Sequence, residues 1–359
     1  MLRVNLIAWD NGVGLSRDLR LIATVLRDAG MSVDIQPGQG RGKLRKWFGP
    51  WARRLRIGWH RLRRRPRFDL NLMLEHIRPE LLGAAHCNAF IPNPEWCLPR
   101  DVKRLKRMDH VLAKTDHAVD IFGHRGCRVA PIGFTSVDRH DAGVPRQRTF
   151  FHLAGRSSAK RTRLVLETWA RHPEWPTLTV VQHPHKARYR PVAANIVHRI
   201  DYVDDAELQQ LQNENLFHLC PSETEGFGHY LVEALSVGAV TLTTDAEPMN
   251  ELVTPERGLL IPFATTQPQQ LATRYQIDAD ALEAAVEAAL ALSDEDIAAR
   301  SQAARAFFLD NDAAFRGRLV EAVAAAARRP GMLGAGVRAT TGAGLQPQGA
   351  PSGCGGARP

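Results

Sequence analysis

The sequence is poor in cysteine. Its five cysteines are Cys87, Cys97, Cys127, Cys220 and Cys354. They are odd in number and far apart, and no two form a Cys-x-x-Cys pair, so neither a disulfide framework nor a zinc site is predicted. No apolar run approaches the ~20 residues of a membrane-spanning helix. The apolar start is too short for a signal peptide and is interrupted by Asn5. We therefore expect a cytoplasmic protein.

Acidic residues are absent from one segment, Arg41 to Arg67, which holds twelve lysines and arginines. The whole chain has a net charge of +9, so the remainder carries about −3. Trp47, Trp51 and Trp59 recur near one helical face among the basic side chains. Three interpretations are open: a helix on an anionic membrane surface, an ordinary cover over a sheet, or a nucleic-acid patch. We expect the membrane surface and no nucleic acid.

Length and patterning indicate two α/β domains. The chain has 359 residues, of which 44% are apolar, enough for two cores. Short strands alternate with helices in residues 1–140, and the pattern restarts at residue 148 after a polar linker. This alternation predicts parallel, doubly wound sheets. Ala-rich helices are expected at residues 279–292, 294–308 and 314–328. Residues 331–359 are rich in Gly, Ala, Pro and Ser and are expected to be disordered.

The most informative stretch is residues 221–245, PSETEGFGHYLVEALSVGAVTLTTD. Gly226 and Gly228 flank Phe227 in a tight turn between a predicted strand and a helix. Glycines let the backbone approach a ligand, and a helix N-terminus offers N–H groups to an anion. Glu225 precedes the turn and Glu233 lies two helical turns later, so the pair suits a phosphorylated, hydroxyl-rich ligand. Taken alone, the spacing fits an ordinary turn with two surface glutamates equally well.

Three further loops carry candidate residues. Gly12 and Gly14 follow the first strand, as in nucleotide-binding domains, although an ordinary βα turn has the same pattern. His76 follows the strand at residues 68–74, at the end of a sheet where α/β sites lie; it either contacts a ligand or is a structural histidine. Arg156 and Lys160 lie in the loop GRSSAK. The arginine could bind a phosphate through two hydrogen bonds at once, and the lysine could bind it as a point charge. Alternatively, both are solvated surface charges.

Residues 221–245 resemble the donor-site signature of the retaining group 1 (family 4-like) glycosyltransferases, Pro-Ser-x-x-Glu-Gly-Phe-Gly followed by a second Glu and a Thr-rich strand. GRSSAK resembles the Gly-Arg-x-x-x-x-Lys loop of that family with one residue fewer. Lys160 keeps the register with the following helix, and Arg161 is the alternative. The resemblance implies a GT-B architecture, two Rossmann-like domains facing across a cleft. The acceptor domain would be residues 1–140 and the donor domain residues 148–328.

The resemblance also implies an activity: transfer of a hexose from a nucleotide diphosphate sugar to a hydroxyl acceptor, with retention and without a metal or other cofactor. The expected context is surface polysaccharide or glycolipid synthesis, with the enzyme peripheral on the inner face of the membrane and a glycan or lipid-linked acceptor. The implied contacts are Arg156, Lys160 and the Gly226–Gly228 backbone to the diphosphate, Glu225 to the sugar, Glu233 to the ribose, Gly12 and Gly14 to the donor, and the backbone near Ile200 to the base.

Two alternatives stay open. One is a GT-B nucleotide-sugar epimerase, which would need catalytic carboxylates in the first domain; the sequence places Glu75 there. The other is a non-catalytic membrane or nucleic-acid binder using residues 41–67.

Overall fold

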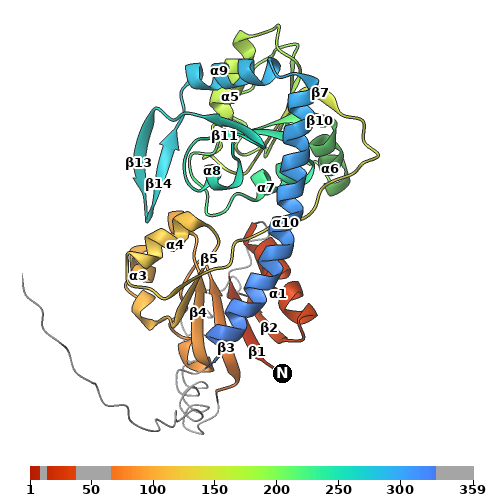
Figure 1. The fold of residues 1–359 in the computed structure, drawn as a ribbon. Coiled ribbons are helices and arrows are strands. Elements are labelled where there is room, and N and C mark those ends of the chain that lie inside the picture. Colours follow the sequence, from red (N-terminus) through yellow and green to blue (C-terminus); the bar gives the residue numbers. More distant parts are fainter. Residues whose placement is uncertain (9–13, 38–65, 329–359) are drawn as a thin grey trace, which may run out of the picture. The chain divides into compact units, whose positions relative to one another are not determined.

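A computed structural model describes residues 1–8, 14–37 and 66–328. Within these residues the chain forms two six-stranded parallel sheets and one small hairpin (Figure 1). The first sheet has the order β2-β1-β3-β4-β5-β6. Its strands are β1 Arg3–Ala8, β2 Ser32–Pro37, β3 Phe68–Leu74, β4 Ala85–Ile91, β5 His110–Ala113 and β6 Val129–Pro131. The helices and 3-10 turns of this part are α1 Gly14–Asp28, η1 Leu82–Ala84, η2 Pro94–Trp96, α3 Pro99–Val102, η3 Leu105–Arg107 and α4 Asp116–Gly123.

The second sheet has the order β12-β11-β10-β7-β8-β9. Its strands are β7 Gln147–Gly155, β8 Leu178–Gln182, β9 Ile196–Arg199, β10 Asn215–Cys220, β11 Val240–Thr244 and β12 Gly258–Ile261. Its helices are α5 Thr162–Arg171, α6 Asp205–Glu214, α7 His229–Ser236, α8 Met249–Leu252 and α9 Ala279–Leu290. If the six strands of this sheet are numbered in chain order from β7, they lie in the order 6-5-4-1-2-3. This is the strand order of the Rossmann fold. The prediction of doubly wound α/β sheets is confirmed.

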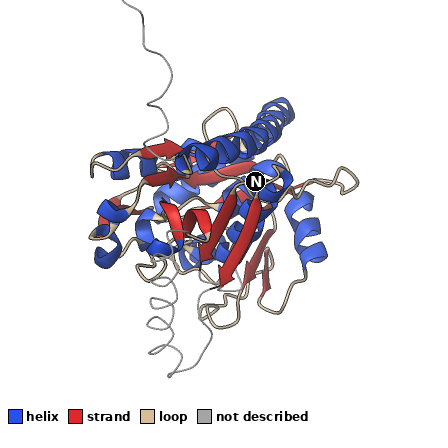
Figure 2. Ribbon diagram, turned by 90° about the horizontal axis from the view of Figure 1, so that it is seen from below, coloured by secondary structure: helices blue, strands red, loops and turns tan. Residues whose placement is uncertain are grey.

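Helices cover both faces of the first sheet, as Figure 2 shows. Successive side chains of a strand point to opposite faces, and the buried residues divide accordingly. Leu6 and Leu72 pack into a core cluster with residues of α1 and the last helix. Their neighbours Ile7 and Met73 pack into another cluster, which contains Phe122 of α4. Two helical layers therefore sandwich the sheet.

A single long helix, α10 (Asp294–Ala326), joins the cores of the two halves. Figure 1 shows it running past both sheets, and its Phe315 meets Phe134 at 4.9 Å between ring centroids. The expectation of two helices, 294–308 and 314–328, is wrong. The residues between them contain neither glycine nor proline, and Asn311 donates a hydrogen bond to the Phe134 carbonyl at 2.7 Å, so the helix continues without a break.

An antiparallel hairpin that the sequence analysis missed follows the second sheet. It pairs β13 (Thr265–Gln269) with β14 (Ala272–Gln276). The N–H of Leu271, in its turn, donates to the Pro94 carbonyl of η2 at 3.2 Å, and the N–H of Tyr275 donates to the Glu223 carbonyl at 2.7 Å. The hairpin thus ties a loop of the first sheet to a loop of the second.

Several expectations fall on residues that the structure does not describe. Gly12, most of the basic segment 41–67 and the tail 331–359 lie outside the described residues. The domain boundaries at 140 and 148 stay predictions. Among the helices of the described chain, none has the length and apolarity that crossing a membrane requires.

Candidate active site

A cavity of about 580 Å³ lies among the loops that follow strands of both sheets. In an open parallel sheet, ligands bind beyond the carboxyl ends of strands where the strand order reverses. Those positions are β1 and β3 in the first sheet and β7 and β10 in the second. Seven of the predicted site residues line this cavity: Arg156, Lys160, Glu225, Gly226, Phe227, Gly228 and Glu233.

The two glycines of the turn before α7 stand at positions where a larger residue would clash or be strained. A Cβ on Gly226 would lie 2.6 Å from Glu95 Oε1 and 2.8 Å from Asn93 Oδ1. Gly228 has a φ of +96°, in the region that favours glycine. Phe227 is buried and lies edge-on to Phe134 at 5.2 Å. The turn therefore brings its backbone close to the loop after β4.

Glu225 and Lys160 lie together on the cavity wall. Ser222 Oγ donates to Glu225 Oε1 at 2.5 Å. Lys160 Nζ donates to the Leu153 carbonyl at 2.8 Å and lies 3.6 Å from the centre of the Tyr230 ring. Burial raises the pKa of Glu225 and lowers the pKa of Lys160, and each charge opposes the shift of the other. The lysine side chain therefore lies on the cavity wall, where a protonated amine could bind a phosphate.

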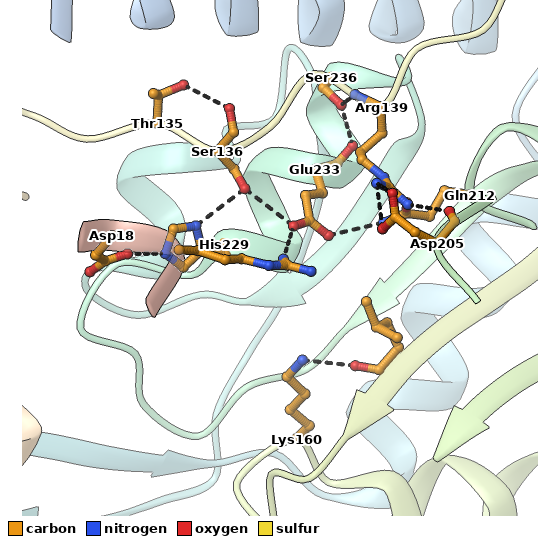
Figure 3. A network of polar contacts seen from close by, with 12 residues as sticks. Asp18, Thr135, Ser136, Arg139, Lys160, Asp205, Gln212, His229, Glu233 and Ser236 are labelled. Atoms are coloured by element: carbon orange, nitrogen blue, oxygen red, sulfur yellow. Dashed lines mark hydrogen bonds and ion pairs between the residues drawn. The ribbon is translucent and has the colours of Figure 1, made fainter. Parts of the chain in front are cut away.

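Glu233 is 2% exposed and accepts three hydrogen bonds. Its Oε1 accepts from Arg17 Nη1 at 2.6 Å and from Ser136 Oγ at 3.2 Å. Its Oε2 accepts from Gln212 Nε2 at 3.1 Å. Figure 3 shows this network, which joins α7 to the segment after β6 and to α6. A carboxylate has about four acceptor positions, so Glu233 keeps capacity for a ligand hydroxyl.

Asp18, in α1, links the two halves at the cavity. His229 Nε2 and Lys114 Nζ each lie 2.6 Å from one of its carboxylate oxygens. Burial pushes the pKa of Asp18 upward, but Lys114 and His229 outweigh burial and lower it to about 2. The carboxylate is therefore ionised at neutral pH and holds a lysine and a histidine in fixed positions.

Arg156 marks the edge of the cavity, and the remaining predicted residues that the structure describes lie outside it. Arg156 is exposed at the cavity edge. Arg161 points elsewhere: its Nη2 donates to the Ile277 carbonyl at 2.9 Å. His76 lines a separate cavity of about 340 Å³ and lies 3.0 Å from Asp101 Oδ2 through Nδ1. Ile200 follows β9 and does not line the main cavity among the residues described. Gly14 is the first residue of α1. The roles of all these residues stay predictions.

Sequence reasoning missed Asp18, Glu95, Lys114 and His229, all of which line the cavity. For two of them a signal was present. Lys114 directly follows β5 and Glu95 follows β4, the position after a strand that identified His76. Asp18 carried no such signal, because its partners lie 96 and 211 residues away.

The cavity can bind a ligand that is anionic at one place and hydroxyl-rich at another. Arg156 and Lys160 supply positive charge on the side of the second sheet, whereas Glu75, Glu95 and Glu225 supply carboxyl groups. No group of three or more His, Cys, Asp or Glu suited to a metal ion occurs within the described ranges. Independence of metal ions stays a prediction.

Comparisons with known proteins cover both the sequence and the fold of the chain. Residues 192–277 match the family "Glycosyl transferases group 1". No curated protein sequence matches the chain. Among solved structures, Anabaena HepE in complex with UDP and glucose is 13% identical with a TM-score of 0.65, covering 90% of this chain and 100% of HepE. Sucrose-phosphate synthase from Thermosynechococcus elongatus is 16% identical with a TM-score of 0.63, covering 91% and 100%.

Larger proteins also share the fold. The pneumococcal O-GlcNAc transferase GtfA, in complex with UDP and GlcNAc, is 13% identical with a TM-score of 0.57 over 76% of this chain. The chain spans only 58% of that GtfA chain and 60% of the chain matched in the GtfA/B complex. The predicted resemblance is confirmed: the chain has the GT-B fold, and its residues 192–277 match the group 1 glycosyltransferase family.

Proposed function

We propose that the protein is a retaining glycosyltransferase that moves a sugar from a nucleotide diphosphate sugar to a hydroxyl acceptor. The observation that carries this proposal is the cavity, where Arg156, Lys160 and the glycine turn face carboxyl groups from both halves of the chain. The family match supports the activity. The solved complexes of similar fold that contain UDP with glucose or GlcNAc support the donor class.

The proposed chemistry replaces the bond between the sugar C1 and the diphosphate oxygen by a bond from C1 to the acceptor oxygen. The diphosphate leaves with the electron pair, and its oxygen takes the acceptor proton on the same face of the sugar. Arg156, Lys160 and the N–H groups of Gly226–Gly228 stabilise the charge that develops on the diphosphate. Glu225 binds sugar hydroxyls, and Glu233 binds the ribose through its remaining acceptor positions.

Nuclear magnetic resonance tests this proposal with UDP-, GDP-, ADP- and dTDP-glucose as donors and with water or added glycans as acceptors. We expect one donor to release its nucleoside diphosphate and the sugar to appear first as the α-anomer. Glu233→Ala should abolish release, whereas Glu287→Ala, an exposed position in α9, should not change it. A β-anomer as first product would contradict retention.

The proposals on the acceptor and on the membrane surface rest on the sequence alone. We propose a surface glycan or lipid-linked acceptor, because the basic, tryptophan-rich segment 41–67 suits an anionic membrane surface. Flotation with vesicles of phosphatidylcholine alone or with added phosphatidylglycerol tests this. Equal flotation with both would contradict the membrane proposal and leave the transferase proposal in place.

One observation favours a second candidate function. A nucleotide-sugar epimerase of this fold would need carboxylates on the side of the first sheet, and Asp18, Glu75 and Glu95 all line the cavity there. Incubation with UDP-GlcNAc without an acceptor distinguishes the two activities. An epimeric sugar among the products would support the epimerase, and its absence together with transfer to an added glycan would support the transferase.

A further inference from the structure

Glu95, in the 3-10 turn η2, is a buried carboxyl group on the cavity wall. It is 6% exposed and lines the same cavity as the glycine turn. A Cβ on Gly226 would lie 2.6 Å from its Oε1, so the carboxyl group faces that turn. Its Oε2 is buried and has no hydrogen-bond partner among the described residues. A buried polar atom without a partner is costly, and a ligand in the cavity would supply one.

The turn that carries Glu95 is fixed from two sides. The Pro94 carbonyl accepts the N–H of Leu271 from the β13–β14 hairpin at 3.2 Å. The Asn93 side-chain oxygen accepts from Lys114 Nζ at 3.1 Å. Glu95 is therefore held in place by both halves of the chain before any ligand binds, which suits a residue that discriminates between ligands.

The charges around Glu95 favour its neutral form. Burial raises its pKa to about 8; Glu225 and Glu75 add to the rise, whereas its own backbone N–H and Lys114 oppose it. Lys114 also pairs with Asp18 at 2.6 Å, and its charge offsets only part of the rise. At neutral pH Glu95 carries a proton and can donate a hydrogen bond.

We propose that the Glu95 carboxyl group donates a hydrogen bond to a hydroxyl of the transferred sugar and thereby selects a sugar that carries this hydroxyl. The inference rests on the proposed glycosyltransferase function and names a specificity residue for it. Its Oε1 faces Gly226, the residue that directly follows Glu225, which is proposed to bind sugar hydroxyls. A sugar without that hydroxyl would leave a buried polar group unpaired, which is a strong basis for rejection.

Calorimetric titration separates contact with the sugar from contact with the nucleotide. The probes are UDP, GDP, ADP and dTDP and their glucose conjugates, titrated between pH 7 and pH 9.5. We expect Glu95→Ala to weaken the bound conjugate about tenfold and to leave the matching diphosphate unchanged. For wild type, the affinity for the conjugate should fall by up to about tenfold as the pH rises through 8 to 9.5, because the ionised carboxylate cannot donate.

Glu95→Gln is the matched variant, because its amide donates at every pH. It should bind the conjugate about as tightly as wild type at pH 7 and lose the alkaline fall. An alkaline fall that persists in Glu95→Gln, or unchanged conjugate binding by Glu95→Ala, would overturn the assignment of Glu95 alone. Deprotonation of Lys160 would instead weaken the binding of the diphosphate as well as that of the conjugate. A wild-type protein that binds none of the diphosphates would overturn the proposed function and this inference with it.

Discussion

At the scale of single residues, charged side chains in the cavity are held by partners from the opposite half of the chain. Asp18 of α1 binds His229 of α7, and Arg17 of α1 binds Glu233 of α7, each at 2.6 Å. The carboxylates are almost completely buried, so water and salt screen their attraction to these partners less than they would at the surface. The site is therefore shaped by pairs that no single domain contains.

Lys160 and Arg161 are adjacent basic residues with different surroundings, which makes them a matched pair. Lys160→Met should weaken binding of the donor diphosphate by about 10- to 100-fold, because a hydrogen bond to a charged group is lost. Arg161→Met should leave the affinity nearly unchanged, because this guanidinium bonds the Ile277 carbonyl instead of facing the main cavity. Titration calorimetry measures both, and equal losses would contradict the assignment.

Asp18 predicts an acid-dependent loss of stability. Its pKa falls from 3.8 to about 2 on folding, so its contribution is present above pH 3.8 and is lost as pH falls toward 2. Between pH 5 and pH 3 the wild type should lose about 1 kcal/mol of its advantage over Asp18→Asn. Urea unfolding at several pH values measures this difference. If the difference in unfolding free energy between wild type and Asp18→Asn does not change with pH, the pKa of Asp18 is not lowered by folding.

Gly226 and Gly317 form another matched pair. Alanine at position 226 would place its Cβ 2.6 Å from Glu95 Oε1, so Gly226→Ala should reduce transfer at least tenfold by displacing Glu95 or the turn. A Cβ on Gly317 in α10 would meet no described atom within 4 Å. Gly317→Ala should keep activity and stabilise the helix by up to about 1 kcal/mol. Full activity of Gly226→Ala would contradict the close packing of the turn.

At the scale of elements, the N-terminus of α4 is capped by a side chain from the other half. Glu251 of α8 accepts the N–H of Asp116 at 2.8 Å and that of His117 at 2.7 Å. The first N–H groups of a helix have no partner within the helix, and a carboxylate is favoured there by the helix dipole. α8 thus stabilises α4 and fastens the two halves together.

Removing this cap gives an expected loss of stability. Glu251→Ala should lower the free energy of unfolding by about 1–2 kcal/mol, measured by urea denaturation. Glu321→Ala, at an exposed position of α10, is the control and should change stability by less than about 0.5 kcal/mol. Equal effects of the two substitutions would contradict a capping role for Glu251.

At the scale of the whole molecule, the sequence predicts what depends on local pattern. The strands at 68–74 and 110–113 appear with the predicted bounds, because their apolar runs are short and clearly bounded. The motif residues after β7 and β10 converge because both strands end at the same edge of one sheet.

Features that depend on contacts between distant parts of the chain could not be read from the sequence. The β13–β14 hairpin has no apolar alternation to mark it, and its β13 is almost entirely exposed. Its contact with the Pro94 carbonyl comes from packing between the two halves. The pairing of Asp18 with Lys114 and His229 likewise requires the folded chain.

The central claim is that one cavity, built by both halves, binds a nucleotide diphosphate sugar. The most direct measurement is calorimetric titration of UDP-, GDP-, ADP- and dTDP-glucose into wild type, Glu233→Ala and Glu287→Ala. We predict that wild type and Glu287→Ala bind one of these nucleotide sugars. Glu233→Ala should not bind it. Binding that survives unchanged in Glu233→Ala, or a folded wild type that binds none of the four, would contradict this account.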